Sequence, residues 1–228
     1  MADPLDLSEA TRRLVRTADA LTDEQYAGAS GLPGWTRAHV LAHLALNAEG
    51  LAGALGGVVE GRSVPMYASQ EARDGDIDEL AAQGPAEVRT RLLAGCTDLA
   101  DAIAAVPEDA AGTTVERTPG GRTFAAADVP WMRLREVEIH HADLDAGYDR
   151  SAWSPEFAAY VLDGMLTRGG ASAPFTARAT DLGREWACGD GGPVVTGRAV
   201  DLAWWMTGRG AGDGLTSEGG DLPQMGAW

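Results

Sequence analysis

Apolar residues recur at helical spacing through most of the first 150 residues of the chain. In the first such stretch, Leu14, Val15, Ala18 and Leu21 share one side of a helix that Ser8 would cap. Glycine and proline clusters separate this stretch from similar ones, as is typical of helices joined by turns. The pattern predicts helices over 8–28, 37–55, 69–82, 86–105 and 125–146, with Thr36 and Ser69 as N-caps of the second and third.

A short hairpin is predicted between the last two of these helices. The stretch TTVERTPGGRTF at 113–124 has β-favouring residues on both sides of a Pro-Gly-Gly turn. Four substantial amphipathic helices with variable connections are typical of an antiparallel four-helix bundle. The core of such a bundle is a natural place for a metal site between facing helices.

The composition changes after Gly147. Ser154-Pro155-Glu156 is a strong helix start for a helix to about 168, and a last helix is expected near 198–208. Between them lie short β-like runs, PFTARAT, REWACG and PVVTG, and the glycine-rich tail from Gly210 is expected to be loosely ordered. The predicted fold class is α+β, mainly α, with a helical bundle at 1–150 and a small α+β domain at 151–228.

The chain is strongly acidic, with 34 acidic and 18 basic residues and a formal net charge of −16. Such a field repels phosphate groups, so nucleic acid and anionic membrane surfaces are poor partners. An anionic small-molecule substrate would therefore need a local arginine. No apolar run approaches the roughly 18 residues that a membrane span needs.

Two features favour a cytoplasmic protein. The N-terminal segment MADPLDLSEATRR has no basic region followed by an apolar one, so it does not have the pattern of a signal peptide. Cys96 and Cys188 are isolated and form no CxxC pair, so we expect free thiols in a reducing compartment.

Three residues carry the candidate chemistry. Glu136 and His140 are four apart, so they share one face of the predicted helix, and His43 lies on another amphipathic helix. A His₂Glu set with one open position is a catalytic zinc arrangement, because structural zinc usually has four protein ligands. Spacing alone leaves three alternatives open: His39 in place of His43, Glu138 with His141 as the ligand pair, or side chains that serve the core and surface without any metal.

Four segments resemble a known family. GWTRAHVLAHLALNAEGL at 34–51 resembles the first metal-binding helix of DinB-like bundles. RLREVEIHHADLDAGY at 133–148 is similar to the second ligand helix of mycothiol-dependent maleylpyruvate isomerases. PMYASQEARDGDI at 65–77 and the C-terminal AWWMTGRG resemble the same family, so the likeness covers nearly the whole chain.

This resemblance implies a DinB-like bundle that binds zinc, or another divalent metal, through His43, Glu136 and His140. It also implies mycothiol as the cofactor thiol and Arg209 as a catalytic residue. The alternative for Arg209 is that its positive charge merely complements the dipole at the end of a helix. Arg73 is a second arginine candidate, with an exposed surface position as the alternative. Asp143 would either orient His140 or simply lie near the helix end.

The implied reaction is the conversion of maleylpyruvate to fumarylpyruvate by thiolate addition, bond rotation and elimination. The expected partners are a small anionic substrate and a low-molecular-weight thiol, and the chain is either a monomer or a homodimer. A mycothiol S-transferase would use the same site but consume the thiol. A non-catalytic metal-binding module is the third reading.

Overall fold

The structure is a computed structural model that describes residues 7–226, apart from the side chains of 167 and 168. The chain divides into two compact units, one that ends at Tyr148 and one that begins at Asp149. Helices predominate, and the larger sheet belongs to the C-terminal unit. The predicted fold class is therefore confirmed.

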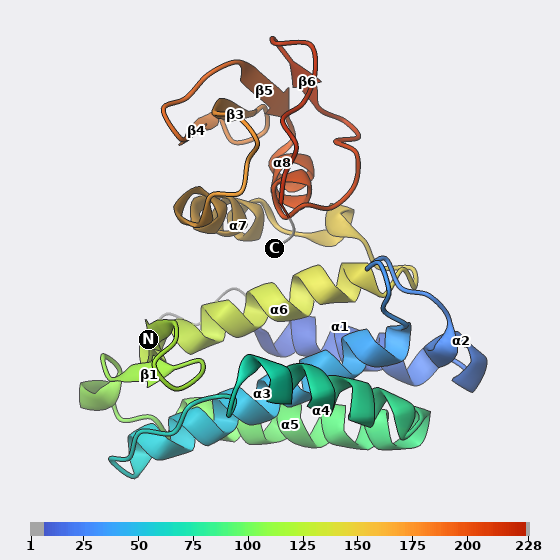
Figure 1. Cartoon of the computed structure of the whole chain (residues 1–228), viewed down its shortest axis with the longest axis vertical. Coiled ribbons are helices and arrows are strands. Elements are labelled where there is room, and N and C mark those ends of the chain that lie inside the picture. The colour runs from blue at the N-terminus through green and yellow to red at the C-terminus, as the bar shows by residue number, and fades with distance from the viewer. Residues whose placement is uncertain (1–6, 227–228) are drawn as a thin grey trace. The chain divides into compact units, whose positions relative to one another are not determined.

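The N-terminal unit is a four-helix bundle formed by the first, third, fifth and sixth helices (Figure 1). Its elements are α1 (Leu7–Ala20), α2 (Asp23–Ala27), α3 (Arg37–Val59), α4 (Gln70–Ala82), α5 (Pro85–Ala105), β1 (Thr114–Glu116), β2 (Thr123–Ala125) and α6 (Val129–Asp143). In the bundle α1 and α6 run in one direction, and α3 and α5 run in the other. Because α3 and α5 are parallel, α4 carries the chain back from the end of α3 to the start of α5. The predicted hairpin is present as β1 and β2.

The first helix differs from its prediction. Ser8 lies inside α1 and is not its cap, and the helix ends at Ala20 rather than continuing to 28. Thr22 then caps α2, where the Thr22 hydroxyl and the Gln25 side chain form a capping box. Two other boundaries move: α3 extends to Val59, and α6 is shorter than 125–146. The caps predicted at Thr36 and Ser69 are confirmed.

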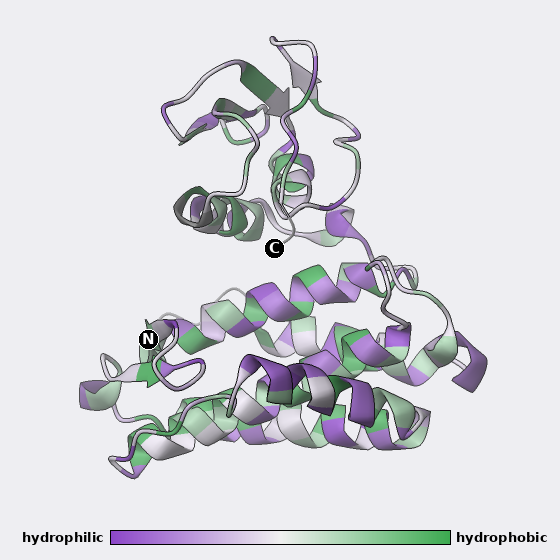
Figure 2. Ribbon diagram, viewed as in Figure 1, coloured by the Kyte–Doolittle hydropathy of each residue, from purple (hydrophilic) through white to green (hydrophobic). Residues whose placement is uncertain are grey.

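The core of the bundle is centred on α3, which is buried on most of its faces. Figure 2 shows hydrophobic and hydrophilic residues interleaved along α4, α5 and α6, as expected of helices that turn one face to a core. Each buried leucine contributes roughly 1.5–3 kcal/mol through removal from water. Fully buried members of this core include Leu14, Leu41, Leu44, Leu51, Leu92 and Val137.

The C-terminal unit packs two helices with a small mixed sheet. Its elements are α7 (Pro155–Arg168), β3 (Phe175–Ala179), β4 (Arg184–Cys188), β5 (Val194–Gly197), α8 (Ala199–Met206) and β6 (Thr216–Ser217). The strand order is β4-β3-β5-β6, with β3 and β5 parallel and the other pairs antiparallel. Phe175 on β3 packs edge-on against Trp205 of α8, with 5.1 Å between ring centroids.

The glycine-rich tail from Gly210 is not loosely ordered as predicted. It supplies β6, which pairs with β5, and the backbone N–H of Ser172 donates to the carbonyl of Gln224. Both cysteines are free, as predicted. No helix in the described part of the chain is long and apolar enough to cross a membrane. The segment tested for a signal peptide begins with residues 1–6, which lie outside the described residues.

Candidate metal centre

The start of α3 separates the roles of two histidines. The Thr36 side chain accepts from the backbone N–H of His39, and the His39 ring accepts from the backbone N–H of Thr36 in return. His39 therefore belongs to the helix cap, and its Nε2 faces Asp78 at 3.7 Å. His43, one turn further along, is buried in the bundle. The structure thus brings His43, and not His39, close to Glu136 and His140.

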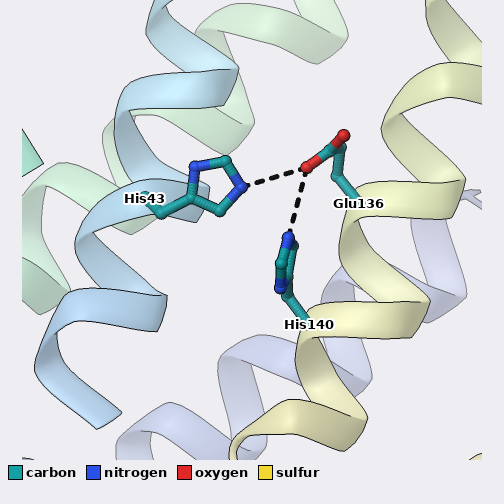
Figure 3. Close-up of side chains that lie close together, drawn as sticks. All are labelled: His43, Glu136 and His140. Carbon is teal, nitrogen blue, oxygen red and sulfur yellow. Dashed lines mark hydrogen bonds and ion pairs between the residues drawn. The ribbon is translucent and has the colours of Figure 1, made fainter. Parts of the chain in front are cut away.

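Glu136 and His140 extend from α6 toward His43 (Figure 3). Glu136 Oε2 lies 3.0 Å from His43 Nε2 and 3.5 Å from His140 Nε2. The two imidazole rings are nearly perpendicular, at 83°, with centroids 4.6 Å apart. One potential ligand atom from each residue lies within 4.8 Å of the other two. The i,i+4 pair therefore shares one face of α6, and α3 supplies the third side chain.

The surroundings set the charge of each group in this cluster. Burial lowers the pKa of His43 to about 4, so its imidazole is neutral near pH 7. Burial disfavours ionisation of Glu136, yet hydrogen bonds from His140 and His43 hold the pKa of this carboxyl well below its usual value. Burial also acts against charge on His140, but its hydrogen bonds with Asp143 and Glu136 prevail and raise the pKa of the ring.

Asp143 orients His140 from behind. Its Oδ2 lies 2.8 Å from His140 Nδ1, and only 2% of Asp143 is exposed. A carboxylate at this place accepts the hydrogen bond from Nδ1–H and fixes the ring so that Nε2 faces Glu136. Of the two predicted roles for Asp143, the structure therefore supports the orienting one.

Arg73 reaches the opposite side of the cluster from α4. Its Nη2 lies 3.0 Å from His43 Nδ1, while Nη1 donates to Asp74 at 2.6 Å. With 15% of its side chain exposed, Arg73 is not the surface arginine considered as an alternative. A guanidinium only donates, so His43 Nδ1 accepts and the ring proton sits on Nε2. A metal at Nε2 requires the other tautomer, so Arg73 competes with metal for His43.

Two aromatic side chains border the cluster. The Trp35 ring lies 5.9 Å from the His43 ring, and the Tyr67 ring lies 5.9 Å from the Arg73 guanidinium carbon. Burial and the nearby Glu136 carboxylate raise the pKa of Tyr67, which keeps its hydroxyl protonated. Sequence reasoning missed Tyr67, because the only signal was its place in the family-like segment at 65–77.

Glu138 and His141 lie on the side of α6 that faces α1. Arg13 donates to Glu138 at 2.8 Å, and the Tyr148 hydroxyl donates to the same carboxylate. His141 Nε2 contacts the Thr17 hydroxyl at 2.7 Å, and its ring stacks on Tyr148 at 3.8 Å. This pair therefore joins α1 to α6 and does not belong to the cluster around His43.

Arg209 belongs to the C-terminal unit, just after α8. Its Nη1 donates to the carbonyl of Thr207 at 3.1 Å, and its guanidinium lies 5.6 Å from the centroid of the Trp204 ring. These contacts hold the side chain against its own helix end. A catalytic role for Arg209 stays a prediction.

The donor set of His43, Glu136 and His140 fits a divalent metal. Two imidazole nitrogens and a carboxylate oxygen suit zinc and also other first-row metals. Among the described residues, no fourth His, Cys, Asp or Glu ligand atom joins the group. A metal held here would keep a position open for a non-protein ligand, as catalytic zinc does. The hydrogen bond from His140 to Asp143 is the outer contact that metal-binding histidines usually make.

Comparison with known proteins places this chain in a family. A crystal structure of the mycothiol-dependent maleylpyruvate isomerase and one of a histidine-to-alanine mutant of it are both similar to this chain. Each has a TM-score of 0.88 and 29% sequence identity, and each match covers 97% of this chain and 93% of the other. No curated protein matches the sequence. The family described as "Mycothiol maleylpyruvate isomerase N-terminal domain" matches residues 7–145, and the chain therefore belongs to this family.

Proposed function

We propose that this protein is a metal- and mycothiol-dependent isomerase that converts maleylpyruvate to fumarylpyruvate. The observation that carries the proposal is the cluster of buried His43 and His140 with partly buried Glu136 in a chain of this family. The similar crystal structures are of a mycothiol-dependent maleylpyruvate isomerase, and the likeness extends over both units of the chain. We infer zinc as the resident metal, because His₂Glu with an open position is typical of catalytic zinc.

Each residue of the centre has a separate part in this proposal. A metal held by the cluster would lower the pKa of a thiol at its open position and so supply thiolate, which adds to the double bond, permits rotation and leaves. Burial keeps His43 neutral, which is the charge state that a metal-binding imidazole needs. Glu136 supplies the negative charge that a buried cation needs. Asp143 keeps the proton of His140 on Nδ1, away from the metal side.

The substrate also needs a cation of its own. Maleylpyruvate is a dicarboxylate, and the chain carries a net charge of −16, so only a local arginine can attract it. Arg73 lies beside His43 and has a buried Nε without a hydrogen-bond partner. We propose that Arg73 binds one substrate carboxylate, and Arg209 remains the candidate for the other carboxylate or for the developing enolate.

The proposal also covers the setting of the reaction. We take the unit that ends at Tyr148 as the metal-binding domain and the unit that begins at Asp149 as a second domain. We place the reaction in the cytoplasm, where a reducing thiol pool would keep Cys96 and Cys188 free.

The test is an absorbance assay of maleylpyruvate loss with purified, zinc-loaded protein, run with and without mycothiol. Wild type should turn over only with the thiol, and mycothiol should be recovered intact. His43→Ala should lose turnover and bound zinc together. His39→Gln is the matched control on the same helix and should keep both, because His39 belongs to the cap of α3.

Two results would contradict the proposed reaction, and a third would contradict the ligand assignment. Zinc-loaded wild type without turnover would exclude the isomerase. Consumption of mycothiol in proportion to substrate would replace it with an S-transferase, since an isomerase returns the thiol. Loss of zinc from His39→Gln but not from His43→Ala would overturn the assignment of the ligand.

A further inference from the structure

A cavity of about 820 Å³ lies between α1, α5 and the first turns of α6, and none of the metal-cluster residues lines it. Its size falls within the range of small-molecule sites, which span roughly 300–1,000 Å³. Helices α1 and α5, which form most of its walls, belong to the N-terminal unit and pack against each other (Figure 1). The isomerase proposed above makes no use of this cavity.

The walls of the cavity are largely apolar. Leu99, Ile103 and Val106 line it from α5 and the residues after it, and Val15 lines it from α1. Leu93, at one end, is 57% exposed, whereas Leu92 and Leu99 on the same helix are buried. An apolar surface inside a concave site favours an apolar ligand, because binding removes both surfaces from water.

A buried arginine supplies a positive charge at the cavity. Arg133 is 1% exposed and lines the cavity together with Cys96. Its Nη1 donates to the Leu44 carbonyl at 2.8 Å and to Asn47 Oδ1 at 2.7 Å, and Nη2 lies 3.5 Å from Cys96 Sγ. All these partners are uncharged. Within the described part of the chain no carboxylate pairs with Arg133, and an uncompensated buried charge is unfavourable.

Two further arginines add positive charge to the lining of the cavity. Arg12 and Arg16 line it from α1, whereas Asp101 is the one acidic residue among the described lining residues. Both arginines also share the carboxylate of Glu9. With Glu9 counted beside Asp101, three arginines face two acids, so the cavity carries a local excess of positive charge in a chain of net charge −16.

The separation of charge and apolar surface sets the length of a fitting ligand. Cys96, beside the Arg133 guanidinium, and Ile103 are seven residues apart on α5, which is roughly 10 Å along a helix. An extended hydrocarbon chain of eight to ten carbons has about this length. We propose that the cavity is a binding site for a single-chain amphipathic carboxylate, with the carboxylate at Arg133 and the chain along Leu99 and Ile103.

The first test is calorimetric titration of the full-length protein with decanoate, decanol and acetate, all below the concentration at which decanoate aggregates. Decanoate should bind at one site per chain. Decanol lacks the charge and acetate lacks the chain, so both should bind at least tenfold more weakly. Equal binding of decanol and decanoate would overturn the role of Arg133, and absence of saturable decanoate binding would overturn the site.

A pair of variants on α5 tests the location without touching Arg133, whose replacement could unfold the bundle. Ala100 is exposed and lines the cavity, whereas Ala94 is exposed on the same helix and does not. Ala100→Trp should fill the cavity and weaken decanoate binding at least tenfold, while Ala94→Trp should leave it unchanged. Equal affinity of decanoate for Ala100→Trp and wild type would place the bound molecule elsewhere.

Discussion

The hydrogen bond between Asp143 and His140 gives the sharpest test of the metal centre. Asp143→Asn keeps the size of the side chain and an oxygen that can accept from Nδ1, but it removes the negative charge behind the ring. Hydrogen bonds to charged groups are about twice as strong as neutral ones. Loss of such an outer partner usually weakens metal binding about 10- to 100-fold, which corresponds to roughly 1.4–2.8 kcal/mol.

Zinc affinity should be measured by competition with a chromophoric chelator, on protein stripped of metal. Asp145→Asn is the matched control: it makes the same change two residues later, at an exposed position where Asn also tolerates the observed φ of 48°. We expect Asp145→Asn to bind zinc like wild type and Asp143→Asn to bind it at least tenfold more weakly at about pH 8.5.

The pH dependence adds a second requirement. Asp143 and Glu136 raise the pKa of His140, so in wild type zinc must displace a proton from this ring once the pH falls below that value. Asp143→Asn should lower the pKa of His140 again, so protons would compete less with zinc for this ring. The difference between wild type and variant should therefore shrink at about pH 6. A difference of less than twofold at high pH, or one that grows toward acid, would refute this reasoning.

Two further predictions concern α3 and its neighbours. Arg73→Gln removes the cation that donates to His43 Nδ1 and so keeps the ring proton on Nε2, where a metal would bind. Zinc affinity in the same chelator assay should therefore rise by about tenfold, as expected for the loss of a hydrogen bond from a charged group; weaker binding would contradict the competing role. Gly50→Ala should destabilise the protein by about 1–3 kcal/mol in urea unfolding, because the new Cβ would lie 2.9 Å from the Met66 carbonyl oxygen. Gly53→Ala on the same helix meets nothing within 4 Å and should stabilise by about 0.5–1 kcal/mol, so equal effects of the two changes would be inconsistent with the close packing at Gly50.

Local sequence signals predicted the parts of the structure that depend on local chemistry. The caps at Thr36 and Ser69 are visible as hydroxyl residues before an apolar stripe, and the structure has both. The i,i+4 spacing of Glu136 and His140 follows from helix geometry alone. The capping box at Thr22 was also local, but an apolar stripe that continues through Leu21 hid the break between α1 and α2.

Other features depend on contacts between distant segments and leave no local pattern. Spacing could not choose between His39 and His43, because residues four apart share a helix face; the choice depends on the cap at Thr36. Arg73 reaches His43 because α4 packs on α3, a fact of tertiary structure. Strand β6 has two residues and exists through its pairing with β5, so a glycine-rich sequence gave no sign of it.

The distribution of the metal-ligand candidates over two helices has a consequence for metal choice. Glu136 and His140 are fixed relative to each other by the pitch of α6, whereas His43 moves with α3. The opening available to an ion is thus controlled by one variable, the spacing of these two helices. Arg133 on α6 holds that spacing from one side through its bonds to Leu44 and Asn47 on α3. Substitutions in the layer between the helices could therefore retune the preference between small and larger cations while every ligand stays in place.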